Sequence, residues 1–207
     1  MAYFPFFIDV QDKTCLIAGG GRVAYRKAKV LLSFGVYITV VSPEFCEELM
    51  ELEKSEAHLV LEKKEFELED LKNAFFVLAA TNDPVVNETI SIFCLKANVL
   101  VNVADSLENS TYLFPSIVRR GGLVTGITTS GKSPDLSKWV RKRMDSLLPD
   151  YLEKLIEELG SYRPVIKKRI ASIADRKQAF KEVMYLGMKM EGKLDQKSVE
   201  QIIRKYE

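Results

Sequence analysis

The sequence is poor in the residues that build metal centres and disulfide frameworks. It has one histidine and three cysteines among 207 residues, and Cys15, Cys46 and Cys94 are too far apart to form a C-x-x-C pair. This composition excludes a His/Cys metal cluster and indicates buried free thiols in a reducing compartment. His58 is expected to be a structural or exposed residue, so no metal-binding residue is predicted.

An excess of charge of one sign and long apolar runs are also missing. The 30 Lys and Arg residues balance 29 Asp and Glu residues, so the overall charge indicates neither a nucleic acid nor a membrane as a partner. The apolar residues 3–8 are too few for a secretion signal, and no stretch approaches the length of a membrane-spanning helix. We therefore expect a soluble, cytoplasmic protein.

Short apolar runs alternate with helical patterns over the first half of the chain. Helical spacing of apolar residues covers 23–34, 45–53 and 85–97. The strand-like runs are residues 14–18, 37–41, 58–61, 75–80 and 99–103. Continuously apolar strands that alternate with helices predict an α/β fold with a parallel sheet covered on both faces.

The most informative stretch is Gly19-Gly20-Gly21-Arg22-Val23-Ala24, which matches G-x-G-x-x-A between a predicted strand and a predicted helix. Glycine permits a tight turn and lets a phosphate approach the backbone. The unpaired N–H groups that open the helix favour an anion. The turn predicts a Rossmann-type dinucleotide site at Gly19, Gly21, Arg22 and Val23, and the alternative is a glycine-rich turn without a ligand.

The pattern changes at about Thr111. Residues 112–118 and 123–129 are extended runs joined by Arg119-Arg120-Gly121-Gly122, which predicts a hairpin. The chain from Pro134 onward is helical in pattern, with breaks expected at Pro149 and Pro164. We predict a Rossmann NAD-binding domain over 1–111, a hairpin–helix dimerisation segment over 112–148 and a small helical domain over 149–207. A second subunit would cover the strand edges and apolar faces of the middle part.

Polar turns follow other predicted strands at the carboxyl end of the sheet, where open α/β sheets bind ligands. The Ser42-Pro43-Glu44 turn stands where an acid usually contacts the adenosine ribose. Serine accommodates a 2′-hydroxyl or a phosphate, but no arginine follows to bind a 2′-phosphate, which favours NAD over NADP. Thr81 lines the cofactor, or belongs to a helix cap that Asn82 or Asp83 forms before Pro84.

Asp105 ends the fifth predicted strand in the sequence Asn102-Val103-Ala104-Asp105. A carboxylate beside a hydride acceptor can take the proton that leaves with the hydride. The alternative is an ordinary turn aspartate before Ser106, and spacing alone favours that alternative.

Residues 126–133 carry the letters of a P-loop, G-x-x-x-x-G-K-[ST]. A P-loop needs later parallel strands and an acid for magnesium, whereas the rest of this chain is helical in pattern. A helix cap with Ser133 at N-cap and Pro134 at the first helical position is the simpler interpretation. Thr129, Ser130, Lys132 and Ser133 would also form a polar, basic rim near the helix N-terminus that can hold a carboxylate ligand.

The motifs, taken in order, resemble those of precorrin-2 dehydrogenase, the NAD-dependent enzyme of sirohaem (tetrapyrrole, porphyrin-type) synthesis. That enzyme is found alone or as the N-terminal part of sirohaem synthases. The resemblance covers residues 4–150, and the helical tail matches in length and character. The motifs are Phe4-Pro5-Phe6-Phe7, Cys15 to Ala28, Ala79-Ala80-Thr81-Asn82-Asp83, Val101-Asn102-Val103-Ala104-Asp105, Phe114-Pro115-Ser116-Ile117-Val118-Arg119-Arg120 and Thr129-Ser130-Gly131-Lys132-Ser133-Pro134.

The resemblance implies a homodimer that oxidises precorrin-2 to sirohydrochlorin with NAD, with Asp105 as the acid/base residue. It implies cofactor contacts at Gly21, Arg22, Val23, the Ser42-Pro43-Glu44 turn and Thr81. Basic and hydroxyl side chains suit the carboxylates of the tetrapyrrole substrate. Substrate contacts are expected at Asn102, Arg119, Arg120, Ser130, Lys132 and Ser133.

Some relatives also insert Fe²⁺, as a substrate, into sirohydrochlorin, and the resemblance leaves this activity open. The sequence departs from the family pattern at Ala104, at residues 106–109 and at Thr128-Thr129. Two other functions stay open on the residues alone. One is a non-catalytic dimer that senses a nucleotide or a tetrapyrrole, in which Asp105 would be dispensable, and the other is a P-loop ATPase at residues 126–133.

Overall fold

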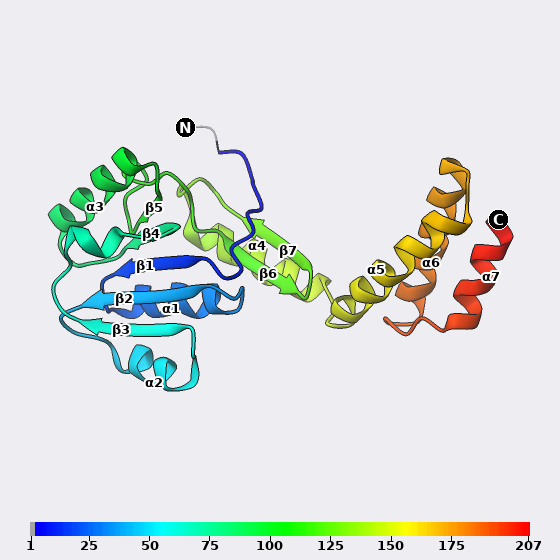
Figure 1. Ribbon diagram of the computed structural model, residues 1–207, viewed down its shortest axis with the longest axis horizontal. Helices are drawn as coiled ribbons and strands as arrows, with labels where there is room; N and C mark the ends of the chain where they lie inside the picture. The colour runs from blue at the N-terminus through cyan, green and yellow to red at the C-terminus, as the bar shows by residue number, and fades with distance from the viewer. Residues whose placement is uncertain (1–2) are drawn as a thin grey trace. The chain divides into compact units, whose positions relative to one another are not determined.

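A computed structural model describes residues 3–207 (Figure 1). The chain divides into two compact units, of which the first ends at Phe114 and the second is Pro115–Glu207. The finer division into residues 1–111, 112–148 and 149–207 stays a prediction.

The first unit is built on a five-stranded sheet in the order β3-β2-β1-β4-β5, in which every neighbouring pair is parallel. The strands are β1 (Thr14–Ala18), β2 (Tyr37–Ser42), β3 (Leu59–Lys63), β4 (Phe76–Ala79) and β5 (Leu100–Val103). The predicted α/β, Rossmann-type fold is confirmed. The strand order reverses between β1 and β4, the place where such sheets open a ligand crevice.

Alternation along the strands divides the core of the first unit into two layers. Cys15 and Ile17 pack toward α1 (Arg22–Leu32) and α2 (Glu47–Ser55), while Leu16 and Ala18 pack toward α3 (Pro84–Ala97). The short 3₁₀ helix η1 (Leu68–Leu71) contacts α3 on its side of the sheet. Both faces are therefore covered, which is why the central strand β4 is apolar and buried at every position, whereas the edge strand β3 ends in two charged residues. The helices and the sheet can be followed in Figure 1.

The second unit begins with an antiparallel hairpin of β6 (Ser116–Arg120) and β7 (Leu123–Ile127). Four helices follow: α4 (Pro134–Leu147), α5 (Tyr151–Arg169), α6 (Ile173–Lys189) and α7 (Gln196–Tyr206). Buried aliphatic residues from the last three helices form their common core. They are Ile166, Ile170, Ala179, Val183, Val199 and Ile203.

Two predicted boundaries are wrong. The first hairpin strand begins at Ser116 rather than at residue 112, because the backbone of Tyr112 is hydrogen-bonded to β5 instead. Its N–H donates to the Val101 carbonyl (3.4 Å), and its carbonyl accepts from the Asn102 side-chain amide (3.0 Å). Pro164 lies inside α5 instead of ending it. Burial of Leu155 and Ile166 on either side of Pro164 holds the helix together across the missing N–H. Pro149 does separate α4 from α5, as predicted.

None of the helices within residues 3–207 is both long enough and apolar enough to cross a membrane.

Candidate functional site

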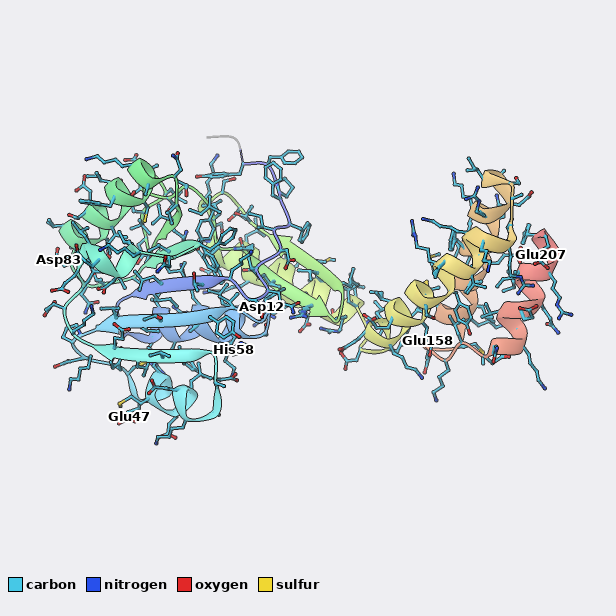
Figure 2. All side chains as sticks on the ribbon, in the orientation of Figure 1. Asp12, Glu47, His58, Asp83, Glu158 and Glu207 are labelled. Carbon is cyan, nitrogen blue, oxygen red and sulfur yellow. The ribbon has the colours of Figure 1, made fainter. Side chains whose placement is uncertain are left out.

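The strand registers bring four turns to one edge of the sheet. Ala18 pairs with Val41 and with Ala79, and Ala79 pairs with Val103, so the strands β1, β2, β4 and β5 end at the same level. Figure 2 labels Asp83, which follows β4 at this edge, and His58, which precedes β3 at the opposite end. Gly19, the residues after β2, Thr81 and Asp105 therefore follow strands that end at a common edge.

The three glycines of the β1 turn have different roles. Gly19 has a positive φ of 111°, and a Cβ there would lie 2.3 Å from the Ala80 carbonyl oxygen. A Cβ at Gly20 would lie 2.0 Å from the Glu44 carbonyl oxygen, whereas one at Gly21 would meet nothing within 4 Å. Gly19 and Gly20 therefore let the turn pack against the turns after β4 and β2, and Gly21 faces open space.

The N-terminus of α1 is left without a cap. Its N-cap residue, Gly21, has no side chain to accept a hydrogen bond, and the first turn holds no acidic residue. Each of the other α-helices within residues 3–207 has a side-chain cap or an acid in its first turn. The bare N–H groups and the open space at Gly21 fit a bound pyrophosphate. Ala24, in the third place of the motif, is fully buried and allows α1 to pack closely on the sheet.

Arg22 and the turn after β2 lie on the α2 side of this site. The exposed Arg22 guanidinium pairs with Glu48 at 3.0 Å. The pKa of Glu48 is lowered by a hydrogen bond from its own backbone N–H and, to a smaller extent, by Arg22. Ser42 is buried at the end of β2, and Pro43 and Glu44 are exposed. Arg22 therefore already has an acidic partner. A second acid, the exposed Glu44, belongs to the turn predicted to bind the ribose.

Thr81 belongs to a hydrogen-bonded cap of α3. Its hydroxyl donates to the Asn87 side-chain oxygen (2.8 Å), and the Asn87 amide donates back to the Thr81 carbonyl (3.1 Å). Asp83 accepts from the Val85 N–H at 2.8 Å as the N-cap residue, with Pro84 next. The cap interpretation is confirmed, and the contact of Thr81 with a cofactor stays a prediction.

Sequence reasoning missed Asn87. Its signal was a polar residue in line with the buried Ile90, Ser91 and Cys94 on one face of α3.

Asp105 is exposed just beyond β5, on a firmly held loop. Its φ is 60°, the left-handed region that aspartate tolerates better than most residues. The Ala104 N–H donates to the Ala79 carbonyl (2.8 Å), which ties the loop to the end of β4. The Ser110 hydroxyl accepts from the Val103 N–H (2.9 Å) and donates to the Ser106 carbonyl (2.7 Å). The loop thus presents the Asp105 carboxylate to solvent at the edge where the strands end.

A hydrogen-bonded pair of the half-buried Lys27 and the buried Asn102 lies next to this loop. The Lys27 ammonium of α1 donates to the Asn102 side-chain oxygen at 2.5 Å, and the Asn102 amide donates to the Tyr112 carbonyl at 3.0 Å. Burial lowers the pKa of Lys27 to about 8, against a smaller raising effect of the Asp105 charge. Both polar groups of the Asn102 amide therefore have hydrogen-bond partners within the chain. The contact of Asn102 with substrate stays a prediction.

The sequence analysis also gave Lys27 no role. The feature that could have indicated one is its position on α1 directly beside the buried residues Ala24, Ala28 and Leu31.

The two arginines of the β6–β7 hairpin differ in their surroundings. Arg119 is exposed and donates to the Gly121 carbonyl at 3.0 Å. Arg120 is mostly buried and pairs with Asp145 at 3.0 Å and with Asp150 at 2.9 Å. Arg120 therefore already holds two carboxylates of the chain, and its role toward substrate stays a prediction.

The turn between β7 and α4 forms the predicted helix cap. Ser133 is the N-cap residue of α4, and its hydroxyl accepts from the Leu136 N–H at 3.3 Å. Lys132 is exposed and Ser130 is half-buried with φ 54°. Because β7 belongs to an antiparallel hairpin, residues 126–133 lack the parallel sheet around a P-loop. Contacts of Ser130, Lys132 and Ser133 with substrate stay predictions.

His58 lies apart from this edge and two of the three cysteines are buried, whereas Cys46 is half-buried at the edge, where its N–H donates to the Gly20 carbonyl at 2.8 Å. The His58 ring stacks on Tyr37 with centroids 4.1 Å apart. Cys15 and Cys94 are buried free thiols, and burial raises the pKa of both. Within residues 3–207, no three His, Cys, Asp or Glu side chains gather in a way that could hold a metal ion.

Comparison with known proteins follows the same division of the chain. Residues 6–116 match the family model described as putative NAD(P)-binding. The siroheme synthase of Ruthia magnifica subsp. Calyptogena magnifica is 35% identical over 177 residues, which are 86% of this chain and 37% of that protein. The siroheme synthase of Nitrosospira multiformis is 35% identical over 187 residues, or 89% of this chain and 40% of that protein. This chain thus spans well under half the length of these curated relatives.

A solved structure is similar over the whole chain. The chain described as "SirC, precorrin-2 dehydrogenase" superposes with a TM-score of 0.80 at 26% identity, covering 99% of this chain and 98% of that one. The resemblance to the precorrin-2 dehydrogenase family found in the motifs is confirmed.

Proposed function

The chain belongs to the putative NAD(P)-binding family, and from this premise we propose that it is an NAD-dependent dehydrogenase that oxidises precorrin-2 to sirohydrochlorin in sirohaem synthesis. One observation carries the proposal. An uncapped helix N-terminus at Gly21 and an exposed carboxylate at Asp105 both follow strands that end at one edge of the sheet. The similarity to a precorrin-2 dehydrogenase along nearly the full chain supports the choice of substrate.

The residues of the β1 turn and of the neighbouring turns would hold NAD. The N–H groups that follow Gly21 bind the pyrophosphate, with Arg22 and Val23 beside it. The Ser42-Pro43-Glu44 turn binds the adenosine ribose, and Thr81 lies by the nicotinamide half. The exposed Glu44 and the Arg22–Glu48 ion pair make this end unfavourable for a 2′-phosphate, which supports NAD over NADP. NAD, when bound, supplies the hydride acceptor.

Asp105 handles the proton of the reaction. Oxidation of precorrin-2 removes two hydrogens: one C–H bond breaks with its electron pair transferred as hydride to NAD⁺, and a second hydrogen leaves as a proton. The Asp105 carboxylate accepts that proton as general base. Asp105 is exposed, so its carboxylate is accessible to a substrate.

The second unit carries side chains whose chemistry suits carboxylate groups. Arg119, Ser130, Lys132 and Ser133 offer guanidinium, ammonium and hydroxyl donors of the kind that acetate and propionate groups accept. The Asp145 and Asp150 partners of Arg120 support a structural role for that arginine, which orders the hairpin against α4 and α5. We also propose that the protein acts in the cytoplasm, because its three cysteines are far apart in the sequence and indicate a reducing compartment.

The enzyme acts as a homodimer through the hairpin–helix segment. Large apolar side chains of α4, Leu136, Trp139 and Leu147, are exposed in the single chain, and a second copy would bury them. Light scattering after size exclusion is expected to give twice the mass of the chain. A Trp139→Lys variant is expected to elute as a monomer, and a wild-type protein that is monomeric at micromolar concentration would contradict the dimer.

Ligand-induced stabilisation tests the cofactor. NAD at about 100 times its dissociation constant is expected to stabilise the protein by about 2.7 kcal/mol, a rise in melting temperature of roughly 5–10 °C at this size. NADP is expected to give a smaller rise, and Mg-ATP none. A rise with Mg-ATP that Lys132→Ala abolishes would instead support an ATPase.

A turnover assay tests the reaction. Incubation with NAD and freshly prepared precorrin-2 is expected to give NADH absorbance and the spectrum of sirohydrochlorin. Absence of both from a folded, NAD-binding protein would exclude the dehydrogenase and favour the sensing dimer. Adding Fe²⁺ to the completed reaction shows by the sirohaem spectrum whether iron insertion follows.

A further inference from the structure

The Lys27–Asn102 pair connects α1 to the strand that carries Asp105. Lys27 lies in the second turn of the helix whose N-terminus faces the proposed pyrophosphate site, and Asn102 lies three residues before Asp105. The hydrogen bond between them is 2.5 Å long and spans 75 residues of sequence. The two halves of the proposed site, cofactor turn and base, are thus joined by one side-chain contact.

The surroundings of Lys27 hold its ammonium in a single place. Its nitrogen lies 5.1 Å from the centroid of the Phe114 ring, a cation–π distance. Asn102, whose amide oxygen accepts the hydrogen bond from Lys27, is only 6% exposed, and its amide nitrogen donates to the Tyr112 carbonyl. Removing the ammonium would leave a buried amide oxygen without its donor, which is costly in a protein interior.

Three charged or titratable groups act on the Lys27 ammonium. Asp105 follows β5, Cys15 belongs to β1 and Arg26 precedes Lys27 on α1. Burial opposes the ammonium most strongly and Arg26 also opposes it, whereas the Asp105 carboxylate favours it. Burial keeps the Cys15 thiol neutral by raising its pKa, so Cys15 carries no negative charge. The Tyr112 hydroxyl lies against the Val77 carbonyl (3.4 Å), and burial raises its pKa well above the usual value, so it stays neutral. Asp105 is therefore the carboxylate to which the charge of Lys27 responds.

We propose that Lys27 is a positioning residue for the dehydrogenation: its charged ammonium holds the Asn102 amide and attracts the Asp105 carboxylate, so that turnover requires Lys27 to be protonated. The inference rests on the proposed function, since it concerns the same base. Lys27 need not touch the substrate. It acts by fixing the end of β5 and by keeping a positive charge near the carboxylate that accepts the proton.

The pKa of Lys27 gives the proposal a direction in pH. The folded protein loses this proton as pH rises through about 8, whereas an unfolded lysine keeps it to about 10.5. The unfolded chain therefore binds more protons between these values, and the Lys27 contribution to the free energy of unfolding rises with pH there. Activity is expected to fall over the same interval, so loss of activity is separable from unfolding.

The experiment compares Lys27→Met, Lys27→Arg and Lys29→Met in the full chain. Lys29 is exposed on the same helix and serves as the matched control. We expect kcat to fall by roughly 10- to 100-fold in Lys27→Met, as misplacement of a catalytic group commonly does, and to stay at the wild-type value in Lys29→Met. Lys27→Arg keeps a donor and a charge at all accessible pH values. It is expected to regain most of the activity and to lose the alkaline fall near pH 8.

A second readout needs no turnover. Lysine amines labelled by ¹³C reductive methylation are titrated by NMR, and the Lys27 signal is identified by its absence from Lys27→Met. Its midpoint is expected near pH 8, and Asp105→Asn is expected to move it lower because a raising charge is lost. A midpoint that Asp105→Asn leaves unchanged would overturn the link between the two residues.

The outcomes separate this inference from the proposed function. If the wild type turns over and the kcat of Lys27→Met equals that of Lys29→Met, the role of Lys27 alone is overturned. The same holds if Lys27→Arg keeps the alkaline fall in activity. No turnover by a folded, NAD-binding wild type overturns the dehydrogenase, and with it this inference.

Discussion

Asp105→Asn is expected to lower kcat for precorrin-2 oxidation by about 10²- to 10⁴-fold, the usual contribution of a positioned general base. Asparagine matches aspartate in shape and also tolerates the left-handed φ of 60° at this position. The hydrogen bonds that hold the loop come from Ala104, Ser110 and the backbone, and the substitution leaves them intact. Alanine would add backbone strain, so asparagine isolates the loss of the proton acceptor. Turnover is followed by NADH absorbance under saturating NAD.

Asp12→Asn is the matched control for this variant. Asp12 is also exposed with a positive φ of 57°, but it precedes β1 and so lies at the opposite end of the sheet (Figure 2). The control is expected to turn over like the wild type, and both variants are expected to keep the NAD-induced rise in melting temperature. An Asp105→Asn enzyme as active as Asp12→Asn would remove Asp105 as the base and favour a sensing role.

Local chemistry explains what the sequence could predict. The β1 turn, the Asp83 cap of α3 and the Ser133 cap of α4 are each determined by a few neighbouring residues, and all three have the predicted structure. The parallel sheet is predictable for a similar reason. Strands buried on both faces must be apolar at every position, and such runs between helices permit few other arrangements.

Contacts between residues far apart in the chain explain the features that the sequence could not predict. Lys27 and Asn102 meet only because β5 lies two strands from β1, and nothing near Lys27 in the sequence indicates that register. Arg120 is the converse case. Its charge suggests a free ligand contact until Asp145 and Asp150, far along the chain, are placed against it. Pro164 is a third, because packing on both sides of it outweighs its local tendency to break a helix.

Gly20→Ala is expected to destabilise the first unit by about 3 kcal/mol, at the upper end of the usual cost of overpacking. A Cβ there would lie 2.0 Å from the Glu44 carbonyl oxygen and 2.8 Å from Cδ1 of Phe45, so backbone must move. The melting temperature is expected to fall by roughly 6–12 °C in a chain of this size, measured by scanning calorimetry. Gly160→Ala, where a Cβ meets nothing within 4 Å inside α5, is the control and is expected to be neutral or slightly stabilising.

Gly21→Ser completes the comparison, because a Cβ at Gly21 would meet nothing within 4 Å. The φ of −84° suits serine, and serine is a favoured N-cap residue, so the unliganded protein is expected to melt at the wild-type temperature or above it. Its side chain would occupy the space and the N–H groups assigned to the pyrophosphate, so the NAD-induced rise in melting temperature is expected to disappear. A Gly21→Ser protein that still gains the wild-type rise with NAD would place the pyrophosphate elsewhere. A Gly20→Ala protein of wild-type stability would contradict the close approach of the β1 and β2 turns on which this site depends.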